Sequence, residues 1–169
     1  MAWSLLAVLA LIMMLTSCDD STIESPVPAG RVHYSCNIGT INLAMGQGTG
    51  QAHIDSPGGY VRIYDKQKLM ATDEVGTGGL LLCHDLSSSS VYAYDLACPY
   101  CYSRGGSPAE KLHRLTVDGF NAQCDKCGSV FGHVFWGMPT PTSGPANKKN
   151  YLLRQYHAHC NGDILVATP

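Results

Sequence analysis

Residues 98–128 read CPYCYSRGGSPAEKLHRLTVDGFNAQCDKCG and contain two C-x-x-C pairs with 22 residues between them. In a C-x-x-C turn both sulfurs face one point, so two such turns brought together present four thiolates in a tetrahedron. Gly128 suits such a turn, because the chain after the second pair must adopt a positive φ. This donor set is that of structural zinc or mononuclear iron, so the predicted metal ligands are Cys98, Cys101, Cys124 and Cys127.

Two other interpretations of the cysteine pairs have to be weighed. Thiols outside the cytoplasm tend to become disulfides unless a metal holds them, so disulfides within or between the two loops are the first alternative. CPYC is also the active-site motif of glutaredoxins, where it opens a helix whose N-terminus lowers the pKa of the first thiol. Here Gly105, Gly106 and Pro108 would break such a helix at once, and no βαβ pattern surrounds it. We therefore reject the glutaredoxin interpretation.

The sequence on both sides of this region consists of short apolar runs separated by turn residues. The runs cover residues 32–38, 41–45, 60–64, 80–83, 91–94, 151–160 and 164–167. A serine tract at 87–90 separates the fourth and fifth runs as a hairpin loop, and Asn161-Gly162, a strong hairpin signal, separates the last two. Eighteen glycines and nine prolines punctuate the chain, and no helical period persists. We predict an all-β fold, a sandwich or a barrel.

The N-terminus has the features of an export signal. Residues 5–15 read LLAVLALIMML, which is shorter than the roughly 20 residues of a membrane-spanning helix but matches the apolar core of a secretory signal. Leu15-Thr16-Ser17-Cys18 resembles the lipobox of bacterial lipoproteins, in which the cysteine is acylated before cleavage. We expect residues 1–17 to be removed and Cys18 to anchor the mature chain in a lipid bilayer, with each buried CH₂ contributing about 0.8 kcal/mol.

The mature chain is expected to lie outside the cytoplasm, on either the cell membrane or the outer membrane. Residues 18–30 are acidic and rich in serine and proline, which predicts a flexible tether before a single domain over 31–169. The formal charge of −2 provides no basic surface for nucleic acid. The sequence identifies no protein or redox partner.

The order of motifs over residues 31–168 resembles the Rieske-domain family. The matching segments are 57–60 and 78–81 for the early strands, 94–99 and 122–131 for the two metal loops, 144–146 for the Gly-Pro-Ala loop and 152–156 for the closing strands. The resemblance implies an antiparallel β-sandwich or barrel. It also implies a small metal-binding loop subdomain of the rubredoxin or zinc-ribbon kind.

The departures from the family concern the metal. A Rieske [2Fe–2S] centre uses two cysteines on one iron and two histidines on the other. The family histidines fall on Tyr100 and Cys127, so Cys101 and Cys127 would have to replace both imidazoles. An all-cysteine [2Fe–2S] cluster, one zinc or iron ion, or a metal-free site remain. Zinc is favoured, because it needs no assembly machinery and the absence of a twin-arginine pair indicates export in the unfolded state.

The remaining cysteines and the nearby aromatic residues have structural interpretations. The resemblance places the first and last strands near each other, so Cys36 and Cys160 are a candidate disulfide; equally, both suit small buried hydrophobes. Cys83 lies in an apolar run and is expected in the core, while Phe135 and Trp136 are expected to cover the metal loops. No residues resemble a catalytic acid–base or nucleophile set. The sequence therefore favours a non-enzymatic structural or binding module, with an electron carrier as the alternative.

Overall fold

The structure is a computed structural model that describes residues 25–39, 41, 53–64, 66 and 69–169. Cys18, the apolar signal stretch and most of the run at 41–45 lie outside the described residues. The described chain is mostly β, as predicted, with two antiparallel sheets and a few short helices. No helix in this described part is long and apolar enough to cross a membrane.

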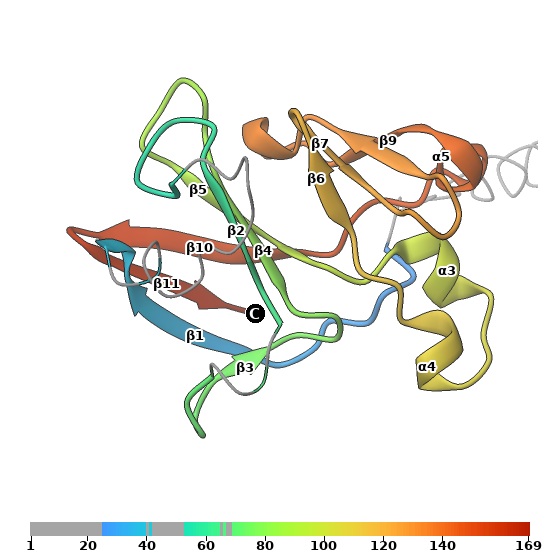
Figure 1. Ribbon diagram of the computed structural model, residues 1–169, viewed down its shortest axis with the longest axis horizontal. Coiled ribbons are helices and arrows are strands. Elements are labelled where there is room, and N and C mark those ends of the chain that lie inside the picture. Colours follow the sequence, from blue (N-terminus) through green and yellow to red (C-terminus); the bar gives the residue numbers. More distant parts are fainter. Residues whose placement is uncertain (1–24, 40, 42–52, 65, 67–68) are drawn as a thin grey trace, which may run out of the picture.

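The larger sheet has seven strands and curves until it is nearly barrel-shaped (Figure 1). Its strands, in the order in which they are hydrogen-bonded, are β2 (Tyr60–Ile63), β4 (Leu80–His84), β5 (Val91–Asp95), β10 (Gln155–Asn161), β11 (Ile164–Thr168), β1 (Val32–Asn37) and β3 (Glu74–Val75). The first and last parts of the described chain therefore lie side by side in one sheet, with β1 paired to β11.

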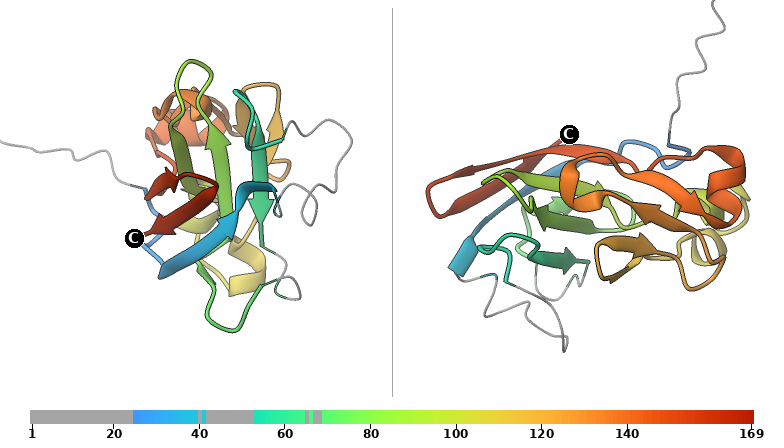
Figure 2. Two further views of the ribbon diagram at one scale, coloured as in Figure 1. Left: turned by 90° about the vertical axis from the view of Figure 1, so that its left-hand side faces the viewer. Right: turned by 90° about the horizontal axis from the view of Figure 1, so that it is seen from above.

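The chain between β5 and β10 forms a separate layer, which we call the cysteine subdomain (residues 97–152). Its four-stranded sheet is ordered β6 (Thr116–Asp118), β7 (Asn121–Gln123), β8 (Val130–Gly132) and β9 (Thr140–Ser143). Short helices complete it: α3 (Pro99–Ser103), α4 (Pro108–Lys111), the 3-10 helix η2 (Val134–Trp136) and α5 (Gly144–Lys149). Figure 2 shows this layer stacked beside the larger sheet from two further directions.

Strand β4 is buried on both faces, which explains why its sequence is continuously apolar rather than alternating. Leu80 and Leu82 face the interior of the larger sheet, whereas Leu81 and Cys83 pack against the cysteine subdomain. All four side chains are completely buried, so Cys83 is a core residue as predicted. Fully burying one leucine side chain stabilises the fold by about 1.5–3 kcal/mol. Because β4 buries side chains on both of its faces, it stabilises the packing of the two layers against each other.

Both predicted hairpins form, one with a shifted turn. Strands β4 and β5 are joined through the serine tract, whose loop is held by the buried carboxylate of Asp85. Asp85 accepts hydrogen bonds from the Ser87 N–H at 2.6 Å and the Tyr92 hydroxyl at 2.8 Å. Strands β10 and β11 pair Asn161 with Ile164, so the turn begins at Gly162, one residue later than predicted. Gly162 has φ 61°, a left-handed conformation that suits glycine.

The chain before residue 31 is packed against the domain in its described part. The Arg154 guanidinium donates to the main-chain oxygens of Val27 (2.8 Å) and Ser25 (3.0 Å), and Val27 is fully buried. The Gly30 N–H lies 3.3 Å from the Tyr156 hydroxyl. The flexible tether predicted over residues 18–30 therefore does not extend through 25–30, because donors far along the chain satisfy the carbonyls of this segment.

The predicted Cys36–Cys160 disulfide does not form in this structure. Strand β11 lies between β1 and β10, and Leu165 is paired with both cysteines. Two strand spacings amount to roughly 9–10 Å, whereas a disulfide needs Cα atoms about 4.4–6.8 Å apart. Both residues are free thiols; Cys36 is half-buried and Cys160 is exposed. The first and last strands are close, as expected, but these two cysteines are not adjacent.

Candidate metal centre

The first cysteine pair opens a short helix. Cys98 occupies the N-cap position of α3 with extended backbone, Pro99 begins the helix, and Cys101 lies inside it. The Tyr102 N–H donates to the Cys98 main-chain oxygen, which sets the turn between the two cysteines. The motif thus does begin a helix, contrary to our expectation. The helix ends at Ser103, before Gly105 and Gly106 with φ of 73° and 99°, so those glycines limit it to five residues.

The second pair forms a knuckle between β7 and β8. The Cys124 N–H donates to the Ser129 main-chain oxygen and the Gly128 N–H to the Cys124 oxygen. Gly128 has φ 70°, the positive value that the sequence predicted. The buried Ser129 hydroxyl accepts from the Cys127 thiol at 3.1 Å and from the Ala146 N–H at 3.0 Å. Ser129 therefore joins the knuckle to the start of α5.

The two loops bring all four cysteines to one place. Their sulfur atoms lie within 4.8 Å of one another. Two contacts run between the loops, 3.6 Å from the Cys98 sulfur to the Cys127 sulfur and 3.7 Å from the Cys101 sulfur to the Cys124 sulfur. A tetrahedral ion with metal–sulfur bonds of about 2.3 Å places its sulfurs about 3.8 Å apart. A disulfide would need about 2.05 Å, and all four are free thiols.

The spacing fits one ion better than a two-iron cluster. In an all-cysteine [2Fe–2S] cluster, each iron holds its own pair of thiolates and bridging sulfides separate the irons. Thiolates on different irons are then farther apart than thiolates that share one ion. A set of four sulfurs that are all within 4.8 Å therefore matches a mononuclear tetrahedral site.

The electrostatics of the group favour a cation. Pairing with Cys124 and burial raise the pKa of Cys98, and burial raises the pKa of Cys101 to about 12. Cys124 has its pKa lowered to about 5, chiefly because the Cys98 thiol and backbone N–H groups donate to it. Burial therefore opposes the charged form of Cys98 and Cys101, while hydrogen bonds favour it at Cys124. A divalent ion supplies the charge that allows all four to ionise.

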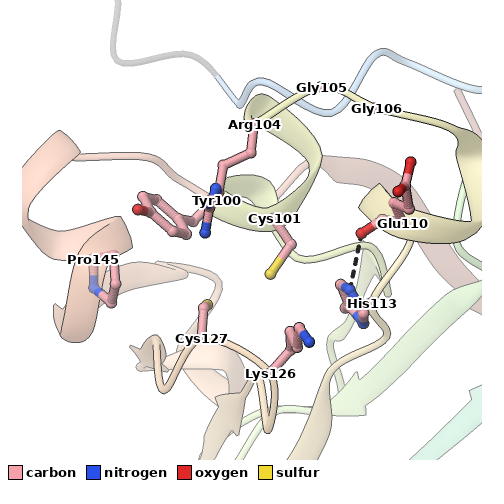
Figure 3. Close-up of a pocket in the computed structure, with 10 residues that line it drawn as sticks. All are labelled: Tyr100, Cys101, Arg104, Gly105, Gly106, Glu110, His113, Lys126, Cys127 and Pro145. Atoms are coloured by element: carbon pink, nitrogen blue, oxygen red, sulfur yellow. Dashed lines mark hydrogen bonds between the residues drawn. The ribbon is translucent and has the colours of Figure 1, made fainter.

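A cavity of about 730 Å³ opens beside the cysteines (Figure 3). Of the four cysteines, only Cys101 and Cys127 line it. Arg104 and Lys126 stand at its edges as exposed cations, and neither pairs with a carboxylate among the described residues. His113 also lines it, with a ring nitrogen 3.0 Å from the Glu110 main-chain oxygen. Glu110 lines the cavity as well, so two cations and one carboxylate surround an opening onto two of the sulfurs.

Sequence reasoning missed the lining residues other than the cysteines. Lys126 lies inside the second C-x-x-C pair and Arg104 follows the first, so adjacency was a usable signal for both. No sequence signal places His113, which is brought to the site when the Cys98 N–H donates to its main-chain oxygen. Tertiary pairing of Ala97 with Arg114 fixes that contact.

A buried carboxylate positions the first loop. Asp95, three residues before Cys98, is completely buried and accepts four hydrogen bonds of 2.7–2.8 Å. The donors are the N–H groups of Thr77, Gly78 and Ala97 and the hydroxyl of Tyr156. Burial raises the pKa of Asp95 while these donors oppose the rise. Gly78 approaches so closely that an added Cβ would lie 2.4 Å from the Ala97 nitrogen.

The aromatic residues expected to cover the loops behave differently from each other. Phe135 is completely buried and belongs to the same apolar cluster as Cys98 and Cys124, so it lies in the core that contains these cysteines. Trp136 remains 39 % exposed and contacts the rings of Phe120 and His133 instead. The tryptophan is therefore part of the surface rather than of the core over the site.

No protein-family model, no curated protein and no solved structure matches this chain. The resemblance to the Rieske-domain family stays a prediction from the sequence. The geometry of the four cysteines is therefore the basis for assigning a function to this chain.

Proposed function

We propose that this protein is a lipid-anchored extracytoplasmic β-domain whose four cysteines bind one metal ion, preferably zinc, in a structural or binding role. The observation that carries the proposal is the spacing of the four sulfurs, all within 4.8 Å of one another, with contacts of 3.6 and 3.7 Å between the loops. These distances suit tetrahedral thiolate coordination and are too long for disulfides.

The proposed role of the ion is to hold the two cysteine loops together. Helix α3 has five residues and strands β6, β7 and β8 have three each, lengths that are marginal in isolation. The ion would join α3 to the knuckle between β7 and β8. A fixed cationic surface formed by Arg104, Lys126 and the elements around them would then be available to a partner.

Zinc is preferred to iron on grounds of assembly. A zinc ion binds to thiolates directly, whereas iron–sulfur clusters are normally assembled by cytosolic machinery before export. The lipobox at residues 15–18 supports anchoring through Cys18. The position of both cysteine loops between β5 and β10, followed by Gly144-Pro145-Ala146, agrees with the motif order of the Rieske-like interpretation.

An electron carrier is the second candidate function, since the cavity exposes two of the four sulfurs. Cys101 and Cys127 line the opening, so a redox-active ion in the site would have a short path to a partner. The same four ligands would hold mononuclear iron.

Elemental analysis of freshly purified, natively expressed protein separates these functions. We expect one zinc per chain and no visible absorbance. One iron per chain, or two irons with two labile sulfides, would contradict the zinc preference and favour electron transfer. Disulfides among the four cysteines in protein isolated with oxidants excluded throughout would contradict metal binding of any kind.

Labelled fatty acid tests the anchor. Cys18→Ser should leave an unprocessed precursor without label, because the lipid is attached to this thiol. Cys160→Ser is the matched control, since Cys160 is an exposed cysteine on β10 and its loss should leave processing and labelling intact. Normal processing and labelling of the Cys18→Ser variant would refute the lipoprotein interpretation.

A further inference from the structure

Solvent reaches the four cysteines unequally. Cys98 and Cys124 are buried and do not line the cavity, whereas Cys101 and Cys127 do. Cys127 is the only one of the four that is half-buried rather than buried. A small reagent entering the cavity therefore meets the Cys127 sulfur first.

Each sulfur at the cavity contacts a buried sulfur from the other loop. Cys127 lies 3.6 Å from Cys98, and Cys101 lies 3.7 Å from Cys124. To form a disulfide, either pair has to close by about 1.6 Å, to the S–S length of about 2.05 Å. Gly128 has no atom within 4 Å of the position that a Cβ would take, so space is open beside the knuckle for such a shift.

The surroundings of the opening are those of a reactive thiol. Arg104 and Lys126 flank the cavity. Oxidation-sensitive cysteines are characteristically accessible, beside positive charge and close to a second thiol that can resolve the first product. Cys127 lines the cavity together with both cations and with Glu110, and its sulfur lies 3.6 Å from that of Cys98. Cys160 is more exposed, but it lies on the larger sheet and outside this group.

We propose that Cys127 is an oxidation site at which a peroxide converts the metal-bound thiolates into disulfides between the loops, first Cys98–Cys127 and then Cys101–Cys124. The inference rests on the proposed metal site. The Cys127 thiolate attacks one peroxide oxygen and the O–O bond breaks. Hydroxide departs, and Cys127 becomes a sulfenic acid. The Cys98 thiolate attacks that sulfur, the S–S bond forms, and a second hydroxide leaves. Two electrons pass from the sulfur pair to the peroxide, and the ion, with two ligands lost, is released as the divalent cation. A second peroxide oxidises Cys101 and Cys124 by the same two steps and accepts the second pair of electrons.

The pairing has a structural consequence. Disulfides within each C-x-x-C pair would leave the two loops unconnected once the ion departs. Disulfides between the loops replace the ion with covalent bonds in nearly the same positions. The oxidised cysteine subdomain should therefore stay closed, whereas removal of the ion by a chelator should open it.

Peroxide titration of the full-length lipidated protein in detergent tests the proposal. Cys160→Ser serves as the background, because it removes the exposed thiol outside the group. Metal content is measured first, ion release is followed with a chromogenic chelator, and unreduced digests are analysed by mass spectrometry. Cleavage after Lys126 separates Cys124 from Cys127, and cleavage after Tyr100 separates Cys98 from Cys101.

The expected result is a Cys98–Cys127 link that appears in parallel with ion release, one ion per first disulfide, followed by Cys101–Cys124. A first disulfide within either loop, or oxidation that leaves the ion in place, would overturn the proposal. If the purified protein lacks metal but forms these links in this order, the metal function fails while the oxidation site stands.

A second variant tests the resolving role of Cys98. In Cys98→Ser, peroxide should leave Cys127 as a sulfenic acid that dimedone labels at least several-fold more than in the parent protein. Unchanged labelling would contradict the role of Cys98. The digest of the parent protein remains decisive even if this variant folds poorly.

Discussion

The larger sheet and the cysteine subdomain are stabilised in different ways. Strand β10 of the sheet has seven residues and β1 has six, whereas three of the four strands of the subdomain have three. The interior of the sheet is mostly aliphatic, with Ile54, Ile63 and Leu165 fully buried. The core of the subdomain also has large apolar side chains, such as Phe131 and Phe135, but three of its buried residues are cysteines of the metal-ligand group.

The difference shows how a short insertion can keep a defined shape. Elements of three to six residues bury little apolar surface and are marginal alone. Cys98, Cys101 and Cys124 are buried within the apolar cluster that joins the subdomain to β4 and β5. An ion on these sulfurs would supply the binding energy that a larger core supplies elsewhere. Four predictions test this comparison.

The largest effect is expected from loss of the metal. Binding contributes roughly 10–16 kcal/mol to folding in small zinc peptides, and less is expected here because the sheet has its own core. A chelator, or Cys124→Ser, should lower amide protection in β6–β9 and α3 by about 3 kcal/mol, while β1, β10 and β11 stay protected. Hydrogen exchange with mass spectrometry measures both regions at once. Equal loss in both would contradict the division between them.

Truncation on the two faces of β4 should separate the layers. Leu82→Ala should lower the free energy of unfolding by about 2–5 kcal/mol, because it leaves a cavity inside the larger sheet. Leu81→Ala should cost a similar amount and, in addition, weaken metal retention, because Leu81 packs against the subdomain. Urea unfolding and a competition assay with a chelator measure the two quantities. If Leu82→Ala weakened metal retention as much as Leu81→Ala, the layers would not be independent.

The Asp95 carboxylate accepts hydrogen bonds beside both regions, and replacing it with asparagine should weaken these bonds. In Asp95→Asn, an NH₂ group replaces one acceptor oxygen and faces donors such as the Thr77 N–H or the Tyr156 hydroxyl. We expect a loss of about 2–3 kcal/mol, since buried donors are left without acceptors. Tyr156→Phe removes one of these donors and should cost less, about 1 kcal/mol. Thermal unfolding of the pair provides the comparison, and equal losses would contradict the central role of the carboxylate.

The smallest effect on stability is expected in the serine loop, which lies outside the cysteine subdomain. Hydrogen bonds from Ser87, Tyr92 and Ser88 hold the pKa of Asp85 well below its usual value. Because the pKa of Asp85 is lower in the folded state, its carboxylate contributes its full stabilisation above about pH 4, the pKa in the unfolded state. This stabilisation is lost as the pH falls below that value. Asp85→Asn should therefore cost about 1 kcal/mol at pH 7 and less at pH 3. Urea unfolding at both pH values measures it; a larger difference at pH 3 would reverse the assigned sign.

The sequence predicted well the features that depend on local pattern. The strand runs at 60–64, 80–83 and 91–94 correspond to β2, β4 and β5, and the two C-x-x-C pairs do converge. Alternation and turn residues determine such features over a few positions, so they can be read without knowing the rest of the fold.

Features set by distant contacts escaped prediction. The short helix α3 forms at CPYC because Pro99 suits the first helical position and Gly105 comes only after the helix has ended. The packing of residues 25–30 depends on Arg154, more than 120 residues away. Cys36 and Cys160 are kept apart by the strand order, which periodicity does not reveal.

The hydrogen bond from Arg154 to the Ser25 main-chain oxygen limits the length of chain between the domain and a lipid anchor at Cys18. Six residues lie between Cys18 and Ser25, which makes seven Cα–Cα steps, and a fully extended chain gains at most about 3.3–3.6 Å per step. With Cys18 lipidated, the fixed point at Ser25 lies no more than about 25 Å from the bilayer surface. The described chain begins beside α3 in Figure 1, at the end of the molecule that carries the cysteine subdomain. An anchor at Cys18 would therefore restrict how the domain can tilt and would hold that end within about 25 Å of the lipid.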